Sequence, residues 1–302
     1  MRWKVVLSFL FFLIVIGLLL FYWFIPFGET SFETKSYNFN LENQTSEMQF
    51  YENMRFLEKD ISYKIYDCPL KKSNDMEQAF EIIANKTILD FYEVNLGEDI
   101  IVTCDSKNKL EEGMFIAGEG GPTNISISGD FSLILHGKIL LIKESDCQLP
   151  NVALHELLHV LGFNHSENEN NLMYPYLNCK QTIGEDMLNL IDELYSIENL
   201  PDLAFENVSA LMNGKYLDTN VSVRNNGLKI SENVKVNIYS DDKFVKEIDF
   251  GELDVGRGKE IRIQNVWVSK INIEQLRFEI DYNYDELEKT NNNLFLKIKD
   301  ED

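Results

Sequence analysis

The fold of the first half of this chain is decided by eleven residues, His155–His165, which read HELLHVLGFNH. The chain has 302 residues but only four histidines, and three of the four lie in this stretch. Residues four apart lie on one face of an α-helix, so His155 and His159 can direct their imidazoles at one point. Gly162 follows where helices commonly end on a left-handed residue, and a turn there can bring back His165. The stretch therefore predicts three imidazole ligands for one metal ion.

Glu156 is the other chemical group of this stretch. Neutral imidazole binds zinc in tetrahedral geometry, and a catalytic zinc keeps its fourth position for water. Glu156 follows the first histidine but points off the ligand face, so we expect it to take a proton from that water. Two histidines at this spacing also occur as ordinary hydrogen-bonded residues of buried helices, but the glycine and the third histidine distinguish this stretch. A closed structural site would need a fourth protein ligand, which the motif lacks.

Helical and strand patterns alternate around this stretch, up to about residue 198. Apolar residues follow helical spacing from 73 to 91, with Asn74 and Glu77 set as a cap and its partner. Further helices are expected from Asn151 and after Thr182. Segments rich in β-branched residues predict strands, namely ISYKIYDC (61–68), DIIVTC (99–104), TNISIS (123–128) and KILLIKE (138–144). Residues 60–198 are therefore predicted to form an α+β domain, with a mixed sheet and helices.

Only strand patterns follow Pro201. Turn signals such as Asn213-Gly214 and Asn226-Gly227 separate them at spacings typical of a β-sandwich. The strand candidates are DLAFENVSAL (202–211), LDTNVSVRN (217–225), ENVKVNIYS (232–240), KFVKEIDFG (243–251), GKEIRIQNVWV (258–268), QLRFEIDYN (275–283) and NLFLKI (293–298). Residues 199–302 are predicted to form an all-β, immunoglobulin-like sandwich.

The N-terminal sequence predicts a membrane anchor. Residues 5–27 carry no charge and, at about 1.5 Å per helical residue, can span a bilayer core of about 30 Å. This run is longer than the apolar core of a removable signal peptide, so we expect it to be retained. Basic residues precede it and acidic residues follow it, which predicts a cytoplasmic N-terminus and extracellular C-terminal domains. Residues 1–28 would be a cytoplasmic stub with a single-pass transmembrane anchor, and residues 29–59 a juxtamembrane segment.

The formal net charge of −22 excludes nucleic acid as a partner, because its phosphates would be repelled. So acidic a chain leaves bound calcium open, but no loop has EF-hand spacing. The four cysteines are an even number, which suits disulfides in an oxidising compartment.

The long motif resembles that of a known enzyme family. HELLHVLGFNHS, followed by LMYP at 172–175, is similar to the metzincin zinc peptidases and, among them, to the matrixins. Ser166 after the third histidine, and Tyr174 and Pro175 after Met173, favour the matrixin-like group. The likeness covers roughly residues 60–198.

This resemblance implies a zinc endopeptidase that cleaves protein or peptide substrates. His155, His159 and His165 would bind one Zn²⁺, Glu156 would act as general base and acid, and Met173 would lie in a turn beneath the metal. The resemblance also implies a substrate extended along an edge strand, for which GGPTNISIS (120–128) is a candidate. Tyr174 and Pro175 would form one wall of the substrate pocket.

Two features of the matrixins have no counterpart here. A second, structural zinc held by histidines is not expected, since only His136 is left over. The stretch YDCPLKK around Cys68 does not match the cysteine motif that keeps many matrixins latent. Instead we predict disulfides between Cys68 and Cys104 and between Cys147 and Cys179, because the first pair flanks the 73–91 helix and the second flanks the histidine helix and Met173.

The C-terminal region resembles the CARDB-type repeats of prokaryotic surface proteins, on the segments LPDLAF (200–205), VRNNG (223–227) and EKTNNN (288–293). This likeness implies a spacer or a module that binds a surface partner, and it assigns no chemistry. It keeps open an alternative function, a non-catalytic binding or adhesion protein at the cell surface that retains a metal site. Glu156 favours the enzyme, because a purely structural site has no need of a carboxylate beside its first ligand.

Overall fold

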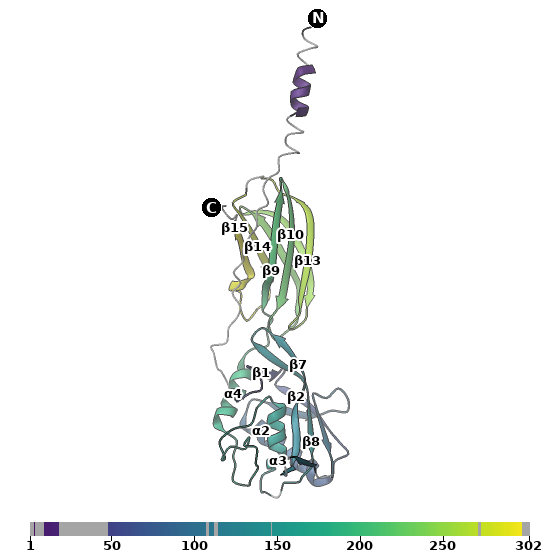
Figure 1. Cartoon of the computed structure of the whole chain (residues 1–302), viewed down its shortest axis with the longest axis vertical. Helices are drawn as coiled ribbons and strands as arrows, with labels where there is room; N and C mark the ends of the chain where they lie inside the picture. The colour runs from purple at the N-terminus through teal and green to yellow at the C-terminus, as the bar shows by residue number, and fades with distance from the viewer. Residues whose placement is uncertain are drawn as a thin grey trace.

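The computed structural model describes residues 3, 9–17, 48–106, 109–111, 114–145, 147–270 and 273–297. Most of the predicted anchor lies outside these residues, although residues 9–17 are helical. Among the described residues, no helix is both long and apolar enough to cross a membrane. Figure 1 shows two folded regions that meet at the tip of a long hairpin.

The first region is built on one mixed sheet. Its strands run β1-β8-β4-β2-β3 with parallel pairing, and β7 lies antiparallel along the other edge of β8. Three helices accompany the sheet, and α3 contacts β7, β8 and α2. The elements are β1 (Met54–Phe56), β2 (Asp60–Tyr66), α2 (Leu70–Lys86), β3 (Asp90–Glu93), β4 (Ile100–Cys104), β5 (Lys109–Glu111), β6 (Met114–Ile116), β7 (Gly118–Ser128), β8 (Phe131–Leu141), α3 (Asn151–Val160) and α4 (Glu185–Ser196).

Helix α3 begins at Asn151 as predicted, but the starts of α2 and α4 differ from the sequence predictions. Helix α2 begins at Leu70, with Pro69 at the cap position and no side-chain cap, so Asn74 lies inside the helix. The extra turn carries the buried Lys72, whose ammonium donates to three carbonyls at the ends of β4 and β8. Likewise α4 is capped by Gly184 and not by Thr182. Tertiary contacts therefore overrode the local capping patterns.

The sheet also takes in residues that the sequence analysis assigned to the juxtamembrane segment. Strand β1 (Met54–Phe56) pairs with β8, and its Arg55 is buried. The Arg55 guanidinium donates to the carbonyls of Phe56, Leu57 and Leu194, the last of these near the C-terminus of α4. The first region therefore begins before the predicted boundary at residue 60.

The second region is a sandwich of two antiparallel sheets, ordered β13-β10-β9 and β12-β11-β14-β15. Apolar side chains on the inner faces alternate with exposed ones and form a separate core. All seven strand candidates of the sequence are strands. They are β9 (Leu203–Asn213), β10 (Tyr216–Asn225), β11 (Ser231–Ser240), β12 (Lys243–Leu253), β13 (Gly258–Trp267), β14 (Gln275–Asp281) and β15 (Asn293–Lys297), with a 3₁₀ turn η1 (Thr290–Asn292) before the last.

Candidate metal centre and active site

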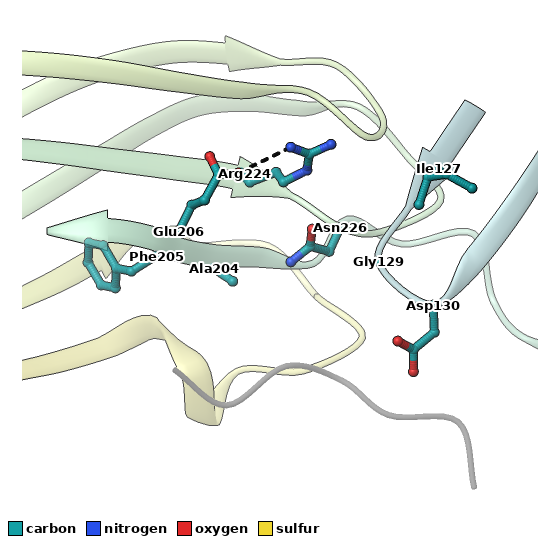
Figure 2. A pocket seen from close by; sticks show the side chains of 8 residues that line it. All are labelled: Ile127, Gly129, Asp130, Ala204, Phe205, Glu206, Arg224 and Asn226. Carbon is teal, nitrogen blue, oxygen red and sulfur yellow. Dashed lines mark hydrogen bonds and ion pairs between the residues drawn. The ribbon is translucent and has the colours of Figure 1, made fainter. Parts of the chain in front are cut away.

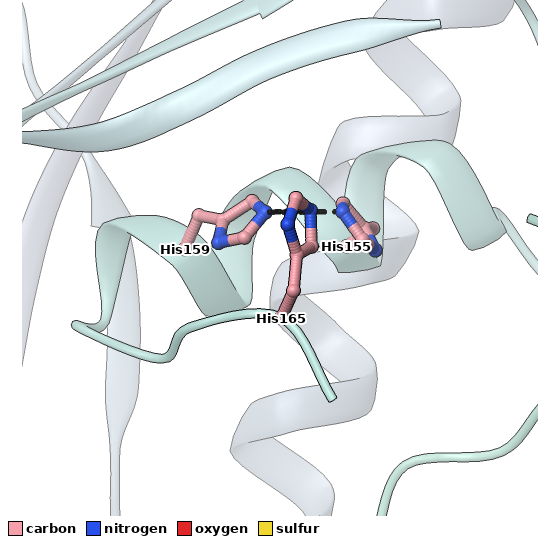
Figure 3. Close-up of side chains that lie close together, drawn as sticks. All are labelled: His155, His159 and His165. Carbon is pink, nitrogen blue, oxygen red and sulfur yellow. Dashed lines mark hydrogen bonds between the residues drawn. The ribbon is translucent and has the colours of Figure 1, made fainter. Parts of the chain in front are cut away.

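The three histidines of the motif converge on one point. Figure 3 shows His155 and His159 projecting from successive turns of α3 and His165 reaching toward them from the following loop. The Nε2 atom of His159 lies 3.0 Å from that of His155 and 3.2 Å from that of His165. Tetrahedral zinc bonds of about 2.0–2.1 Å would hold ligand nitrogens about 3.3 Å apart, so the spacing fits that ion.

The protonation of two of these rings is fixed by the backbone. His155 Nδ1 lies 2.8 Å from Leu172 O, and His159 Nδ1 lies 2.8 Å from Phe163 O. A carbonyl oxygen can only accept, so both Nδ1 atoms carry the proton and both Nε2 atoms carry a lone pair. Two lone pairs 3.0 Å apart repel each other unless a cation or a proton lies between them. This is the arrangement that a metal-ligating histidine pair requires.

Burial keeps these imidazoles neutral. It lowers the pKa of His155 to about 4 and the pKa of His159 to about 3, and it also lowers the pKa of His165. Metal ions compete with protons for the same lone pairs. The site is therefore ready to bind a cation at neutral pH without first losing protons.

Glu156 is buried beside the histidines, on the side of α3 that faces β7. Burial raises the pKa of its carboxyl to about 8, and the negative charge of Glu119 on β7 adds to this effect. The first residues of β7 approach α3 closely. A methyl group at Gly118 would lie 2.7 Å from Glu156 Oε1, and one at Gly120 would overlap the Glu156 carbonyl oxygen. A side chain at Gly120 would therefore require the backbone of α3 to shift, whereas one at Gly118 would require the Glu156 side chain to move.

Sequence reasoning missed the role of these glycines. The sequence predicts a strand for only part of the stretch GEGG at 118–121, although a glycine inside a strand is a known sign of close backbone approach. Gly121, by contrast, has open space around it. The glycines therefore indicate a close backbone contact, but the sequence does not show that the contact is with Glu156 of α3.

The turn after α3 depends on Gly162, which has a φ of 98°. A side chain there would also meet Met54, whose Cγ lies 2.8 Å from the position of the missing Cβ. The turn is held from outside by the segment Met48–Phe50. Phe50 N donates to Gly162 O at 2.9 Å, and Asn164 N donates to Met48 O at 2.7 Å.

The same segment touches a histidine directly. The Phe50 ring stacks on His159, with the ring centroids 5.7 Å apart and the planes 25° from parallel. Its neighbour Gln49 is buried and exchanges two hydrogen bonds with the backbone of Met54. Residues 48–50 thus brace both the His159 ring and the loop that leads to His165, and no periodic pattern in the sequence predicts this contact.

Comparison with known proteins agrees with this geometry. The matrixin family model matches residues 38–196, more than half of the chain. This chain belongs to the matrixin family. The CARDB family model matches residues 200–295. A comparison with curated proteins finds no match.

Two solved structures are each similar to about a third of this chain. One is the CARDB domain of a Pyrococcus furiosus protein in complex with di-metal ions, 19% identical, covering 33% of this chain and 88% of that one, with a TM-score of 0.28. The other is a domain of a Methanosarcina acetivorans protein described as a cell surface protein, 17% identical, covering 33% and 90%, with a TM-score of 0.29.

In the matrixin domain, Met173 is fully buried next to the histidine loop. Its carbonyl accepts a hydrogen bond from Ser166 N at 2.8 Å, and its amide donates to Asn171 Oδ1 at 2.8 Å. The preceding carbonyl, of Leu172, is the one that holds His155. The turn therefore supports the first ligand through its backbone.

The structure also shows where the remaining residues singled out by the sequence analysis lie. Tyr174 is half-buried and Pro175 is exposed, directly after the Met173 turn. His136 is exposed on β8, away from the three histidines. Disulfides join the predicted partners, Cys68 to Cys104 and Cys147 to Cys179, with S–S distances of 2.07 Å.

Proposed function

We propose that this chain is a zinc endopeptidase that is anchored in the cell membrane and faces outward. Membership of the matrixin family supports a zinc peptidase, and one observation carries the metal site. The lone pairs of His155 and His159 face each other at 3.0 Å in a buried place where both rings are neutral. A metal ion bound between these two nitrogens would relieve the repulsion of their lone pairs, and His165 would supply a third ligand from the following loop.

Glu156 is proposed as the general base and acid. A bound zinc ion would supply Lewis acidity, lowering the pKa of a bound water to about 7 and polarising the scissile carbonyl. The Glu156 carboxylate accepts the proton of the attacking water and passes it to the leaving amine. Burial disfavours its charged form, and a nearby divalent cation acts in the opposite direction, so the carboxylate regains its role as a base when the site is loaded.

The substrate is proposed to lie along β7. This strand is bonded to β8 on one edge, and its other edge has no strand partner within the described part of the chain. An extended peptide can pair with such an edge through its backbone. The start of β7 packs against Glu156, so the paired peptide passes the general base. Tyr174 and Pro175 are proposed to form the pocket wall beyond the scissile bond.

The anchor and the location remain proposals based on the sequence. The uncharged run at 5–27, the charges on either side of it and two disulfides support a single-pass protein with its folded regions outside the cell. Peptides and proteins of the cell exterior would then be the substrates, and the sandwich would act as a spacer or bind a surface partner.

Substitutions in the full-length chain test the enzyme against the binding protein. We expect Glu156→Ala to retain zinc but to cleave a peptide library about 10²- to 10⁴-fold more slowly, because general acid–base catalysis contributes about that much. His159→Ala should lose both the zinc and the activity, since two ligands hold the ion loosely. Glu81→Ala, on the exposed face of α2, is the matched control and should resemble the parent.

Zinc content by elemental analysis is measured beside each rate. A parent chain that holds one zinc yet cleaves no peptide would favour the binding or adhesion protein. Equal rates for the parent and Glu156→Ala would remove Glu156 from the reaction.

A further inference from the structure

The two ends of the sandwich differ in what lies against them. At one end, the buried Ser128 Oγ at the tip of the β7–β8 hairpin donates to Gly227 O at 2.6 Å. A Cβ at Gly129 would lie 2.7 Å from Asn226 O, and Figure 2 shows these two residues close together. The opposite end points away from the matrixin domain, as Figure 1 shows. We call it the free end, and it consists of the β9–β10, β11–β12 and β13–β14 connections.

Exposed aromatic side chains gather at the free end. Among the described residues of the sandwich, Ile230 and Tyr284 are the exposed large apolar side chains near the matrixin domain. The others are all aromatic, and each lies within two residues of the end of its strand at the free end, namely Tyr216, Phe244, Trp267 and Phe295. Single exposed apolar residues are normal on a protein surface, but a cluster at one end of a domain indicates a contact surface.

Two of these aromatic residues are neighbours on the three-stranded sheet. Tyr216, the first residue of β10, is paired with Trp267, the last residue of β13. The next residue of β10, Leu217, is fully buried in the core of the sandwich. Successive side chains of a strand point to opposite faces, so Tyr216 and Trp267 lie on the outer face of this sheet.

The four-stranded sheet carries a second aromatic row at the same end. Phe244 of β12 is paired with Tyr239 of β11, and their ring centroids lie 5.9 Å apart. The row continues through Arg277 of β14 to Phe295 of β15. Arg277 Cζ lies 3.9 Å from the centroid of the Tyr239 ring, so a cation covers the middle of the row. Because the preceding residue of β11, Ile238, is fully buried, this row also lies on an outer face.

The two rows lie on opposite sides of the sandwich at the same end, and we call them together the aromatic belt (Tyr216, Tyr239, Phe244, Trp267 and Phe295). A groove for a glycan or a peptide would use the residues of one face only. A flat interface laid across the free end contacts both faces at once. Tyr and Trp collect in this way at membrane–water interfaces, where rings with an apolar body and a polar edge lie at the level of the headgroups. The belt therefore fits the surface of a lipid bilayer.

A lysine lies in or directly beside each connection of the free end, namely Lys215, Lys243 and Lys270. Lys243 and Lys270 are exposed, and Lys270 Nζ also lies 2.9 Å from Asp241 Oδ2. The formal net charge of the chain is −22, so anionic lipids would repel most of its surface. Lysines at the free end supply a local attraction to the phosphates of the headgroups.

The chain between the predicted anchor and the described structure is long enough for this contact. Gln49 is hydrogen-bonded to Met54, which is paired with Ser132 close to the hairpin tip, so residue 48 lies near the junction of the two regions. The longest strands of the sandwich have 11 residues, which at about 3.3 Å each is about 36 Å. Residues 28–47 can span up to about 66 Å when extended. The predicted anchor and the free end can therefore reach the same bilayer.

We infer that the free end of the sandwich docks on the lipid bilayer in which the chain is anchored, with the aromatic belt at the level of the headgroups and the three lysines against their phosphates. This inference rests on the anchor of the proposed function. Docked in this way, the sandwich holds the matrixin domain one strand length, about 36 Å, from the bilayer. Substrates of the peptidase would then be chains that extend to that height above the membrane.

The emission of Trp267 tests this docking in the full-length chain. The other two tryptophans, Trp3 and Trp23, are replaced by Phe, and the protein is reconstituted in vesicles of phosphatidylcholine and phosphatidylglycerol with a nitroxide on the lipid headgroups. The nitroxide quenches only a nearby indole. Because the anchor holds the sandwich at a high local concentration beside the bilayer, the emission of Trp267 should fall at least about twofold.

A tryptophan at the other end of the sandwich is the matched control. Tyr284 is 57% exposed, close to the 59% of Trp267, but it lies near the matrixin domain. In a chain with Tyr284→Trp and Trp267→Phe, the single indole should keep its emission in the same vesicles.

Substitutions at the free end test whether the belt and the lysines hold the contact. The pair Lys243→Glu and Phe244→Thr removes one cation and one ring of the belt, while threonine keeps the residue type that a strand favours. We expect it to lower the docking equilibrium about tenfold, seen as a partial recovery of Trp267 emission. Lys229→Glu with Ile230→Thr is the matched control, because this exposed lysine and its apolar neighbour lie near the matrixin domain, and the quenching should persist.

Flotation of the same vesicles separates this inference from the proposed anchor. A chain that floats with the vesicles, yet whose Trp267 is quenched no more than the tryptophan at position 284, would overturn the docking and leave the anchor and the peptidase intact. Quenching that persists in the Lys243→Glu and Phe244→Thr chain would overturn it as well. A blue shift of Trp267 that grows with the protein-to-lipid ratio, without nitroxide quenching, would mean that a second copy covers the belt instead. A chain that does not float would overturn the anchor and the docking together.

Discussion

Each folded region contains a buried glutamate, and the two carboxyl groups differ in the hydrogen bonds and charges around them. Glu286 of the sandwich is 8% exposed and accepts hydrogen bonds from Leu203 N at 2.9 Å and Asn292 Nδ2 at 2.7 Å. Glu156 of the matrixin domain is 4% exposed, and its carboxyl lies near the negative Glu119. Burial raises both pKa values, but hydrogen bonds oppose the rise at Glu286, whereas both influences at Glu156 raise it, to about 8.

The difference separates a structural carboxylate from a reactive one. A buried carboxylate that serves the fold is hydrogen-bonded, because an unpaired one costs several kcal/mol. A buried carboxylate that serves chemistry is held ready for a proton and for a charge that arrives with the metal or the substrate. In this chain Glu286 of the sandwich has the surroundings of the first kind, and Glu156 of the matrixin domain has those expected of the second, in line with its proposed role.

The same substitution at both glutamates gives the sharpest test of this contrast. In chelated, zinc-free protein at pH 7, Glu156→Gln should raise the free energy of unfolding by about 2–3 kcal/mol, since it removes the cost of burying an acid. Glu286→Gln should lower the free energy of unfolding by about 2 kcal/mol, because the amide nitrogen of the new glutamine would face one of the two N–H donors, Leu203 N or Asn292 Nδ2. Urea titration that resolves the two regions measures both values. Changes of equal sign would end the distinction between the two sites.

The burial of Glu156 depends on the close approach of β7, and a methyl group can test that cause. Gly120→Ala would overlap the Glu156 carbonyl oxygen, so we expect a loss of about 2–3 kcal/mol in unfolding free energy and a lower peptidase rate. Gly121→Ala, one residue later in open space, is the control and should change the stability by less than about 0.5 kcal/mol. If both variants behave alike, the fit of β7 against α3 does not determine the site.

The pH dependence of zinc-free protein provides a third test. The pKa of Glu156 is raised in the folded state, so its protonated form is favoured there and stability falls as pH rises toward about 8. The pKa values of His155 and His159 are lowered to about 4 and 3, so their contribution is complete above the ordinary histidine pKa and is lost at lower pH. Between pH 6.5 and 8 the Glu156 effect is the larger one, and the last part of the histidine contribution opposes it.

In that window the parent should lose about 1.5 kcal/mol of unfolding free energy relative to Glu156→Gln, because the histidine contribution is the same in both proteins. Chemical unfolding at several pH values in the presence of a chelator measures this. Parent and Glu156→Gln curves that run parallel from pH 6.5 to 8 would show that Glu156 is an ordinary carboxylate in the folded protein.

The sequence predicts the ligands and the sandwich because both depend on short-range patterns. His155, His159 and Gly162 lie within one helix and its end, so their spacing alone determines where they point. The sandwich strands alternate apolar and polar residues, and the burial of β14 follows that alternation without exception. The two disulfides were predicted from the helices that they flank, and the structure joins the same cysteines.

Features that depend on contacts between distant segments were not predicted. Asn74 and Thr182 have the residue types of helix caps, but Pro69 and Gly184 take the cap positions because packing fixes where α2 and α4 begin. Arg55 gives no sign in the sequence that it is buried, since its acceptors are three backbone carbonyls and the Asn199 side chain, up to 144 residues away. The contact between Gly129, at the tip of the β7–β8 hairpin, and Asn226 of the sandwich was also not predicted, because the sequence around Gly129 is that of an ordinary turn.

The brace formed by residues 48–50 gives the smallest predicted effect and extends the contrast to the segment nearest the anchor. Phe50 touches His159 through its ring, and its amide holds the turn at Gly162, so removing the ring should loosen one ligand without changing the backbone contact. We expect Phe50→Ala to raise the dissociation constant for zinc about three- to tenfold, less than the loss of a hydrogen-bonded partner of a metal ligand would. Tyr51→Ala is the control, because Tyr51 is adjacent and exposed. Competition with a zinc-binding dye measures both constants without relying on activity. Equal weakening in the two variants would point to a general loosening of the N-terminal segment, and parent-like binding by Phe50→Ala would mean that the Nδ1 hydrogen bond to Phe163 alone orients His159.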